Sequence, residues 1–454
     1  MQRQSAAVRC RRACRLAVAS AAGLISFAVT AAEDGANPAG GMTAQARALR
    51  CPNPENPRHR QFECHTLAPD FERTLLADLR DVRSELQASG VTPTANYTGA
   101  LFANTSNPPR EGSYGGGLHA AVNLDFGRIS GVAGLSGYLE AWWMQAANAD
   151  SILYTSLFPA NSNFVGNGLW VGQIYLQQTL AAGDLIVAAG RLAPGATFAT
   201  LPVFANYTSQ AINGNPRALI VNEPPFAPPP PGTQWGFQAL HHLTPAWQGM
   251  LGVFNNNPDS SAGRNHGLDW SWRSGNSGAL AVAQVNRFVN TGPGETGMPG
   301  QYSIGFFVDG NRFATVSGAP ETVKGKTGAY VMAQQQITRP DGAGSARGIT
   351  IWGAVAGSGP QDVNLLPLFI AAGMSWQGPS ASRPQDNAAV GWYYGKPSNT
   401  LQPPASNSQS IELNYQYAIT RALNLLLDAQ YVFRVNGLPS PGMAVVGLQL
   451  AATF

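Results

Sequence analysis

The chain has 454 residues, of which 12% are charged and 44% are hydrophobic, and it carries a formal net charge of +3. Soluble domains contain about 25% charged residues, so this composition argues against an ordinary soluble domain. The sequence has no Lys/Arg cluster interleaved with aromatic residues, which disfavours nucleic-acid binding.

The first 31 residues have the pattern of a secretory signal peptide. They contain five arginines and no acidic residue, an apolar stretch over residues 16–28, and the small-residue ending Val29-Thr30-Ala31. An N-terminal membrane anchor is the alternative, but the apolar stretch is short for a membrane helix. Removal of residues 1–31 leaves 23 basic and 25 acidic residues, so the exported chain carries a net charge of about −2.

Residues 32–66 form a Gly/Pro-rich segment that contains Cys51 and Cys64. In an oxidising compartment such a pair is expected to form a disulfide. His59 and His65 lie beside the two cysteines, yet this set lacks the second pair of ligands that a zinc site requires. We therefore predict no metal and no cofactor.

Residues 67–90 are predicted to contain a short amphipathic helix that packs on a larger body. Leu75, Leu79, Val82 and Leu86 share one face of this helix, and Gly90 ends it. A coiled-coil partner helix is the alternative interpretation.

From residue 91 to residue 454 the sequence consists of runs of about ten residues in which apolar and polar side chains alternate between Gly, Asn, Pro and Asp turns. In "IELNYQYA", for example, Ile411 and Leu413 lie on one side while Glu412 and Asn414 lie on the other. An apolar outer face, a polar inner face and aromatic residues near the rims are typical of a transmembrane β-barrel. We predict that the following residues face the lumen: Glu140, Gln334, Gln336, Glu412, Asn414, Gln416, Asp428 and Gln430. Four tryptophans are predicted to face lipid or to lie in the rim girdle: Trp143, Trp170, Trp270 and Trp272.

The alternation continues to the last residue, Phe454, so the final strand is predicted to close the ring against the first one. About seventeen candidate strands can be drawn, including "GLDWSWRS" with Asp269 and Arg273 on its polar side. Bacterial single-chain barrels have even strand numbers, so we predict sixteen strands, with one error between residues 267 and 325. Phe454 is also the candidate signal for the outer-membrane assembly machinery.

The longest predicted connection spans residues 192–233 and includes "NEPPFAPPPPGTQ". Loops of this length are usually functional or disordered. We predict that this loop folds inward and narrows the channel; a flexible surface loop is the alternative. Common hydrolase, metalloprotease and P-loop motifs are absent from the sequence, so we predict no enzymatic activity.

Three stretches resemble the carbohydrate-selective porins of the OprB family: "LRDVRSELQASGVTPTANYTGALFAN", "YLQQTLAAGDLIVAAGRLAPGATFA" and "QWGFQALHHLTPAWQGMLGVFNNNPDSSAGRNHGLDW". Together with Phe454, they place the resemblance over residues 67–454. It implies a sixteen-stranded barrel of the bacterial outer membrane through which monosaccharides diffuse. By their place in these motifs, the candidate constriction residues are Glu140 and Arg191, with Arg217, Asp269 and Arg273 as weaker additions. The alternative for Glu140 and Arg191 is a structural ion pair in the lumen wall.

The sequence thus predicts a passive sugar porin whose partners are small sugars, outer-membrane lipid and, as a candidate assembly, two further copies in a homotrimer. The alternative function is a plugged or structural outer-membrane protein without transport activity.

Overall fold

The computed structural model describes Leu75 and residues 80–106, 110–147, 150–162, 167–229, 232–257, 265–272, 278–292, 295–342, 345–439 and 441–454. The predicted signal peptide, the segment 32–66 with Cys51 and Cys64, and Arg273 lie outside the described residues.

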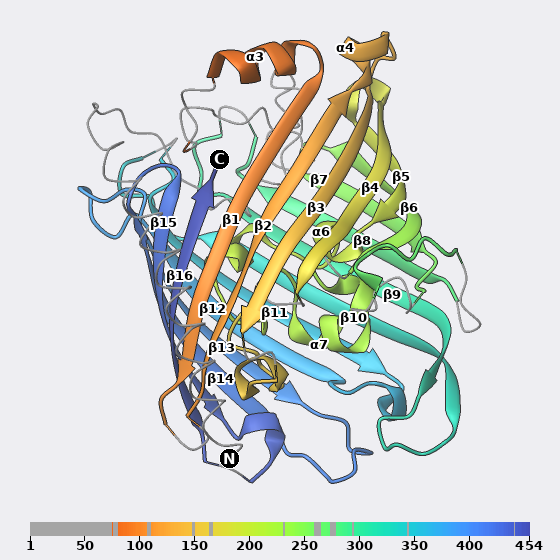
Figure 1. Cartoon of the computed structure of the whole chain (residues 1–454), viewed down its shortest axis with the longest axis vertical. Helices are drawn as coiled ribbons and strands as arrows, with labels where there is room; N and C mark the ends of the chain where they lie inside the picture. Colours follow the sequence, from red (N-terminus) through yellow and green to blue (C-terminus); the bar gives the residue numbers. More distant parts are fainter. Residues whose placement is uncertain are drawn as a thin grey trace, which may run out of the picture. The chain divides into compact units, whose positions relative to one another are not determined.

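Sixteen antiparallel strands form one closed barrel, which confirms the predicted fold class (Figure 1). The strands are β1 Val91–Asn104, β2 Gly112–Asp125, β3 Leu135–Ala147, β4 Gly168–Leu180, β5 Leu185–Leu192, β6 Gln234–Thr244, β7 Trp247–Phe254, β8 Leu280–Val289, β9 Gly300–Ala314, β10 Thr322–Gln336, β11 Gly348–Gly359, β12 Leu368–Gln377, β13 Asn387–Lys396, β14 Ser408–Ala418, β15 Leu423–Phe433 and β16 Met443–Thr453.

The last strand closes the barrel against the first. β1 and β16 pair antiparallel from Asn96 opposite Thr453 to Asn104 opposite Val445. The Phe454 N–H then donates to the Ala95 carbonyl oxygen at 2.9 Å, so the pairing extends to the chain end. Because a closed barrel pairs every strand edge, the backbone groups are satisfied without water.

The strands follow the predicted alternation. Along β9 and β10, exposed and buried residues alternate over most of each strand. The outward positions carry exposed apolar side chains such as Ile304, Val331 and Leu413. The inward positions of the neighbouring strands carry buried polar side chains such as Gln284 and Glu412. This arrangement suits a wall with lipid outside and polar groups inside.

One predicted strand, "GLDWSWRS", is wrong. Residues 265–272 form a turn and an irregular segment in the connection between β7 and β8. Four successive carbonyl oxygens of this segment, those of residues 269–272, accept hydrogen bonds from side chains and not from a neighbouring strand. The donors are, in the same order, Arg191, Trp235, Asn257 and Asn255. The alternating pattern therefore belongs to an irregular segment whose carbonyl groups are bound by side chains. When this segment is removed from the seventeen candidates, sixteen strands remain.

The helices of the described residues are short and lie at the barrel ends or within loops. They are α3 Arg80–Ala88, α4 Phe126–Ser130, α5 Ile152–Thr155, α6 Pro194–Thr197 and α7 Arg217–Asn222, with 3-10 turns η5 Ala181–Gly183, η6 Pro202–Asn206, η7 Pro224–Phe226, η9 Gln361–Val363 and η10 Val435–Gly437. In this part of the chain, no helix has the length and apolar content needed to cross a membrane. α3 covers the second half of the region 67–90, and the Leu75 N–H donates to the Thr453 carbonyl oxygen.

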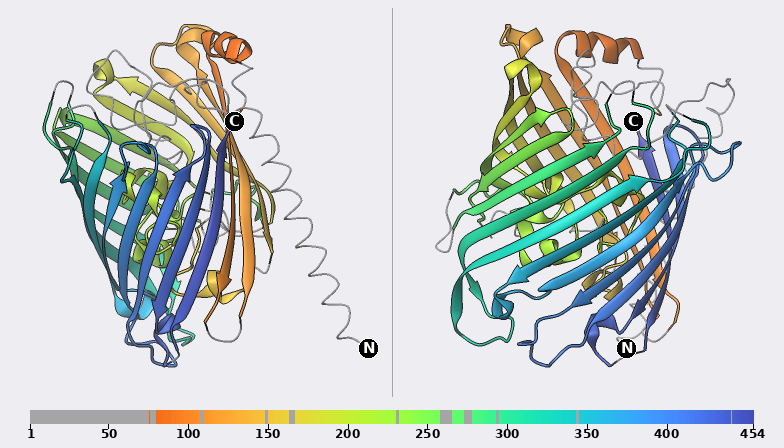
Figure 2. Two further views of the ribbon diagram at one scale, coloured as in Figure 1. Left: turned by 90° about the vertical axis from the view of Figure 1, so that its left-hand side faces the viewer. Right: turned by 180° about the vertical axis from the view of Figure 1, so that it is seen from behind.

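The end of the barrel that holds the C-terminus also holds α3, α4 and several short turns, whereas the longest connections leave the opposite end (Figures 1 and 2). Short turns are periplasmic and long loops extracellular in outer-membrane barrels.

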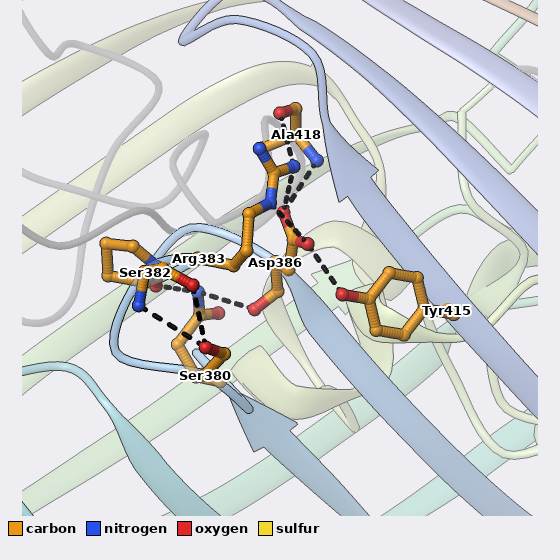
Figure 3. Close-up of polar contacts among 8 residues, drawn as sticks. Ser380, Ser382, Arg383, Asp386, Tyr415 and Ala418 are labelled. Atoms are coloured by element: carbon orange, nitrogen blue, oxygen red, sulfur yellow. Dashed lines mark hydrogen bonds and ion pairs between the residues drawn. The ribbon is translucent and has the colours of Figure 1, made fainter.

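A charged clamp fixes one turn at the C-terminal end (Figure 3). Arg383 binds Asp386 through two hydrogen bonds of 2.9 and 2.7 Å, and Asp386 also accepts hydrogen bonds from the Tyr415 hydroxyl and the Ala418 N–H.

Candidate functional site

Residues 193–233, which we call the inner loop, connect β5 to β6 and contain α6, η6, α7 and η7. Figures 1 and 2 show α6 and α7 inside the ring of strands. The main chain of the loop is held by inward-facing glutamines: the Ala199 N–H donates to Gln284 at 2.9 Å, and the Val203 N–H donates to Gln334 at 3.0 Å. The inner loop is therefore attached to the lumen face of β8 and β10.

An aromatic contact attaches the middle of the inner loop to β11. The Tyr207 hydroxyl accepts a hydrogen bond from Trp352 Nε1 at 2.6 Å and lies 3.0 Å from the Met374 carbonyl oxygen. Phe204 and Tyr207 both meet the Trp352 ring edge to face, with centroids 5.4 and 5.2 Å away. The three side chains of this contact, Phe204 and Tyr207 of the loop and Trp352 of the wall, are buried, so the loop is packed as a core element.

Four of the predicted lumen residues hold the next part of the loop. The Thr208 N–H donates to Glu412 Oε1 at 2.6 Å, and its hydroxyl lies 3.1 Å from Glu412 and 3.0 Å from Asp428. Gln430 donates to the same hydroxyl, and Asn414 donates to the Asn206 carbonyl oxygen. The wall of β14 and β15 thus presents acceptors and amides that fix the inner loop across the barrel.

The end of α7 is held by a buried charged group. Glu223 Oε1 lies 3.9 Å from Lys326 Nζ, and Lys326 also donates to the Asn222 carbonyl oxygen at 2.7 Å. Asn256 donates to Glu223 at 3.4 Å and forms a further hydrogen bond with Asp309. These contacts connect the inner loop to β9, β10 and the connection after β7.

Glu140 lies on the lumen face of β3, inside a polar and aromatic cluster. It accepts hydrogen bonds from the Tyr138 hydroxyl at 3.0 Å and from the Gln173 N–H at 3.1 Å, and it lies 3.3 Å from His119 Nε2. Its carboxylate occupies the space beside Gly172, where an added Cβ would come within 2.3 Å of Glu140 Oε1. A side chain at position 172 would therefore displace the Glu140 carboxylate from this place.

Trp142, which the sequence did not single out, extends this cluster. Its side chain is partly exposed and its ring lies 4.3 Å from that of His119, but its indole Nε1 is buried without a hydrogen-bond partner among the described residues. Gln173 links the cluster to the inner loop, because its side-chain oxygen accepts from the Ala193 N–H at 2.9 Å. β2 to β4 thus place a ring, an imidazole and a carboxylate beside the first residue of the inner loop.

Arg191 and Asp269 meet at the wall. Arg191 is only 1% exposed; its Nε donates to the Thr233 hydroxyl at 2.9 Å and its Nη1 to the Asp269 carbonyl oxygen at 2.8 Å. The Asp269 carboxylate instead caps its own segment by accepting from the Ser271 N–H at 2.9 Å. Both residues thus organise the extracellular rim.

The predicted lipid-facing tryptophans divide into two groups. Trp143 is exposed on β3, and Trp270 and Trp272 are exposed on the irregular segment. The prediction is wrong for Trp170, which is buried and lies 5.1 Å from the His266 ring. The pairing of β3 with β4 shifts register near Glu140. This shift changes which residues of β4 point inward, so Trp170 faces the interior of the barrel.

Arg217, the first residue of α7, is held by neutral groups. Its Nε donates to the Leu157 carbonyl oxygen at 2.8 Å and its Nη1 to the Gln210 side chain. Burial lowers the pKa of the guanidinium to about 10, so it stays charged at neutral pH. The remaining face of the inner loop is neutral where it is partly exposed, at Thr197, Thr200, Asn206 and Gln210.

The other predicted lumen residues lie on inward positions. Gln336 is buried and accepts from Arg339, whereas Gln334 and Gln416 are partly exposed. Across the described part of the chain, no cluster of three or more His, Cys, Asp or Glu side chains suits a metal ion. His241 and His242 point to opposite faces of β6, one exposed and one buried.

A closed antiparallel barrel with its longest loop attached inside the lumen defines the porin class of outer-membrane channels. The sequence model described as "Carbohydrate-selective porin, OprB family" matches residues 110–454. The chain therefore belongs to the OprB family, which confirms the resemblance and places the protein in the bacterial outer membrane.

Solved structures share the fold, and one curated relative shares part of the sequence. The fold superimposes on the high-pH structure of Pseudomonas putida OprB with a TM-score of 0.74 at 19% identity, covering 83% of this chain and 97% of that one. Salmonella typhi OmpF gives a TM-score of 0.52 at 9% identity, covering 81% and 98%. A protein of Acinetobacter baylyi named "Putative porin QuiX" is 24% identical over 252 residues, 48% of this chain, and the match spans about half (55%) of that relative's length.

Proposed function

We propose that the barrel lets monosaccharides and other small sugars diffuse passively across the outer membrane through a narrowed, water-filled channel. One observation carries this proposal. Among the described residues, the partly exposed groups of the inner loop and of the cluster beside it include hydroxyls, amides and the Trp142 ring, with Arg217 as the charged side chain of the loop, whereas the wall carboxylates are buried among hydrogen-bond donors.

Such groups suit sugars. Hydroxyl and amide side chains at Thr197, Thr200, Asn206 and Gln210 can replace part of a sugar's hydration with hydrogen bonds. The Trp142 ring can stack on the apolar C–H face of a pyranose. Each contact is individually weak, and permeation requires binding that is weak enough for release.

The family description, carbohydrate-selective porin, supports the carbohydrate assignment. We further propose that residues 1–31 are cleaved on export, that the assembly machinery recognises the strand ending at Phe454, and that Cys51 and Cys64 form a disulfide. A homotrimer is the proposed assembly. Of the constriction candidates, Arg217 is proposed to contact the sugar, and Glu140 is proposed to line the passage beside Trp142.

Liposome swelling tests the function. Vesicles that contain the purified barrel are transferred to isotonic glucose, maltotriose or maltoheptaose, and swelling rates are compared with those of protein-free vesicles. We expect fast entry of glucose and a steep decrease with sugar size. Swelling no faster than in protein-free vesicles, together with no current in planar bilayers, would instead support the plugged or structural alternative.

A further inference from the structure

One charge of the inner loop has no counter-ion among the residues that the structure describes. Between residues 193 and 233 the only charged side chains are Arg217 and Glu223. Glu223 is fully buried, with Lys326 Nζ at 3.9 Å. Arg217 is partly exposed, and within the described residues no carboxylate forms an ion pair with it. The exposed charge of this loop is therefore positive.

The arginine has donors left for a ligand. A guanidinium has five N–H groups in a planar fork. One goes to the Leu157 carbonyl oxygen and one to the Gln210 side chain. The other three N–H groups, two of them on Nη2, have no partner in the part of the chain that the structure describes. The two existing contacts fix the orientation of the guanidinium, so its three remaining N–H groups keep a fixed orientation.

The wall offers little opposing charge. Its inward carboxylates Glu140, Asp309, Glu412 and Asp428 are at most 6% exposed. Each of them is covered by donors, such as Tyr138 on Glu140, the Asn311 N–H on Asp309, and Thr208 on Glu412 and Asp428. Among the described residues of the inner loop and these four wall carboxylates, the negative groups are buried and the positive group, Arg217, is partly exposed.

We propose that Arg217 binds the carboxylate of anionic sugars, so that the channel carries sugar acids such as uronates in preference to neutral sugars of the same size. This inference rests on the proposed function, because it assigns a substrate class to the same channel. Arginine pairs with carboxylates through charge-assisted hydrogen bonds, which are stronger than neutral ones. Since two of its donors are already engaged by neutral acceptors, the site is pre-oriented, and its partial exposure keeps the bound state exchangeable.

The test compares glucuronate with glucose, because the two solutes share a ring and differ mainly in charge. The measured quantity is the ratio of their permeation rates in proteoliposomes, for the wild type and for Arg217→Gln, Arg217→Lys and Arg434→Gln. Arg434 is a matched control, since it is exposed on the connection between β15 and β16 and donates to Asn407 at 3.2 Å.

We expect Arg217→Gln to lower the glucuronate-to-glucose ratio by about three- to tenfold, the effect of losing one net hydrogen bond at a partly exposed site. Arg217→Lys should keep an intermediate ratio, because it keeps the charge but loses the planar fork of donors, and Arg434→Gln should leave the ratio unchanged. An unchanged ratio in Arg217→Gln, or equal losses for both solutes, would overturn the inference and leave Arg217 as a brace between Leu157 and Gln210. Absence of glucose entry in the wild type would instead contradict the proposed function.

Discussion

Arg191 Nη1 donates to the main-chain oxygen of Asp269 at 2.8 Å, although 78 residues separate the two in sequence. The contact joins the end of β5 to the connection after β7. β5 ends at Leu192, close to the middle of β4. The first residues of β4, which begins at Gly168, therefore have no partner on β5 and leave a gap in the wall beside them. Residues 265–272 fill this gap, where the Val171 N–H donates to the His266 carbonyl oxygen at 3.0 Å.

Replacement of Arg191 by methionine should destabilise the barrel, because Thr233 and the Asp269 carbonyl both lose a charged donor. We expect the free energy of unfolding to decrease by about 1.5–3 kcal/mol per lost bond to the charged group. Urea unfolding in detergent micelles, followed by tryptophan fluorescence, measures this change, because Trp235 lies opposite Arg191 on β6 and contacts Trp270, the residue after Asp269. Arg434→Met is the control, and an equal unfolding midpoint in the two variants would rule out the proposed bracing role.

Replacement of Trp142 by alanine should weaken the interaction of sugars with the channel. An aromatic contact contributes about 0.5–1.5 kcal/mol, so we expect glucose to block the ion current with an affinity about two- to tenfold lower. A glucose titration of single-channel conductance in planar bilayers measures the affinity. Trp376→Ala on β12 is the control, since that ring is exposed on the outer face. Identical titrations for the two variants would show that Trp142 does not contact the sugar.

The Arg383–Asp386 clamp should make stability depend on acid pH. Burial acts to raise the pKa of Asp386, but hydrogen bonds from Arg383, Tyr415 and the Ala418 N–H outweigh it, so the pKa lies below its usual value. A carboxyl whose pKa is lower in the folded state stabilises the fold above its unfolded pKa of about 3.9, and this stabilisation is lost as the pH falls through the folded pKa.

Asp386→Asn should therefore lower the free energy of unfolding by about 1–3 kcal/mol at pH 7, with less difference from the wild type as the pH decreases below 4. Unfolding midpoints between pH 2.5 and 7 measure the effect. Asp341→Asn is the control, because Asp341 pairs with Arg347 in another turn but is largely exposed, and such pairs contribute about 0–1 kcal/mol. A constant difference between Asp386→Asn and the wild type over this pH range would contradict the assignment.

The barrel could be predicted from the sequence because strand alternation is local. Ile411 and Leu413 point outward and Glu412 inward because of their positions alone, whatever the rest of the chain does. The same reasoning failed at Leu268, Trp270 and Trp272, where the alternation is real but the backbone acceptors are taken by distant side chains.

The candidate site was harder to predict because it depends on strand register and on contacts across the barrel. His119 and Trp142 become neighbours only when β2 and β3 pair with these two residues opposite each other. Thr208 and Glu412 are 204 residues apart. A long Pro-rich connection indicated an inward loop, but no local pattern in it identifies Tyr207 or Thr208 as the attached residues.

Replacement of Tyr207 by phenylalanine should loosen the inner loop without changing its shape. The variant removes one oxygen, which accepts from Trp352 Nε1 and lies within hydrogen-bond distance of the Met374 and Val390 carbonyls. Because the indole N–H would then be buried without a partner, we expect the free energy of unfolding to decrease by about 1–3 kcal/mol. The ring contact with Trp352 remains, so the loop should stay inside the barrel but move more.

We therefore expect single-channel recordings of Tyr207→Phe to show the wild-type mean conductance with larger current fluctuations in the open state. Tyr431→Phe is the matched control, because Tyr431 is exposed on the outer face of β15. Open-state current fluctuations in Tyr207→Phe no larger than in the wild type would show that the contacts of Thr208 and Val203 hold the loop without the Tyr207 hydroxyl. A large increase in mean conductance would show that the hydroxyl alone keeps the loop in the lumen, since the channel would then widen when it is removed.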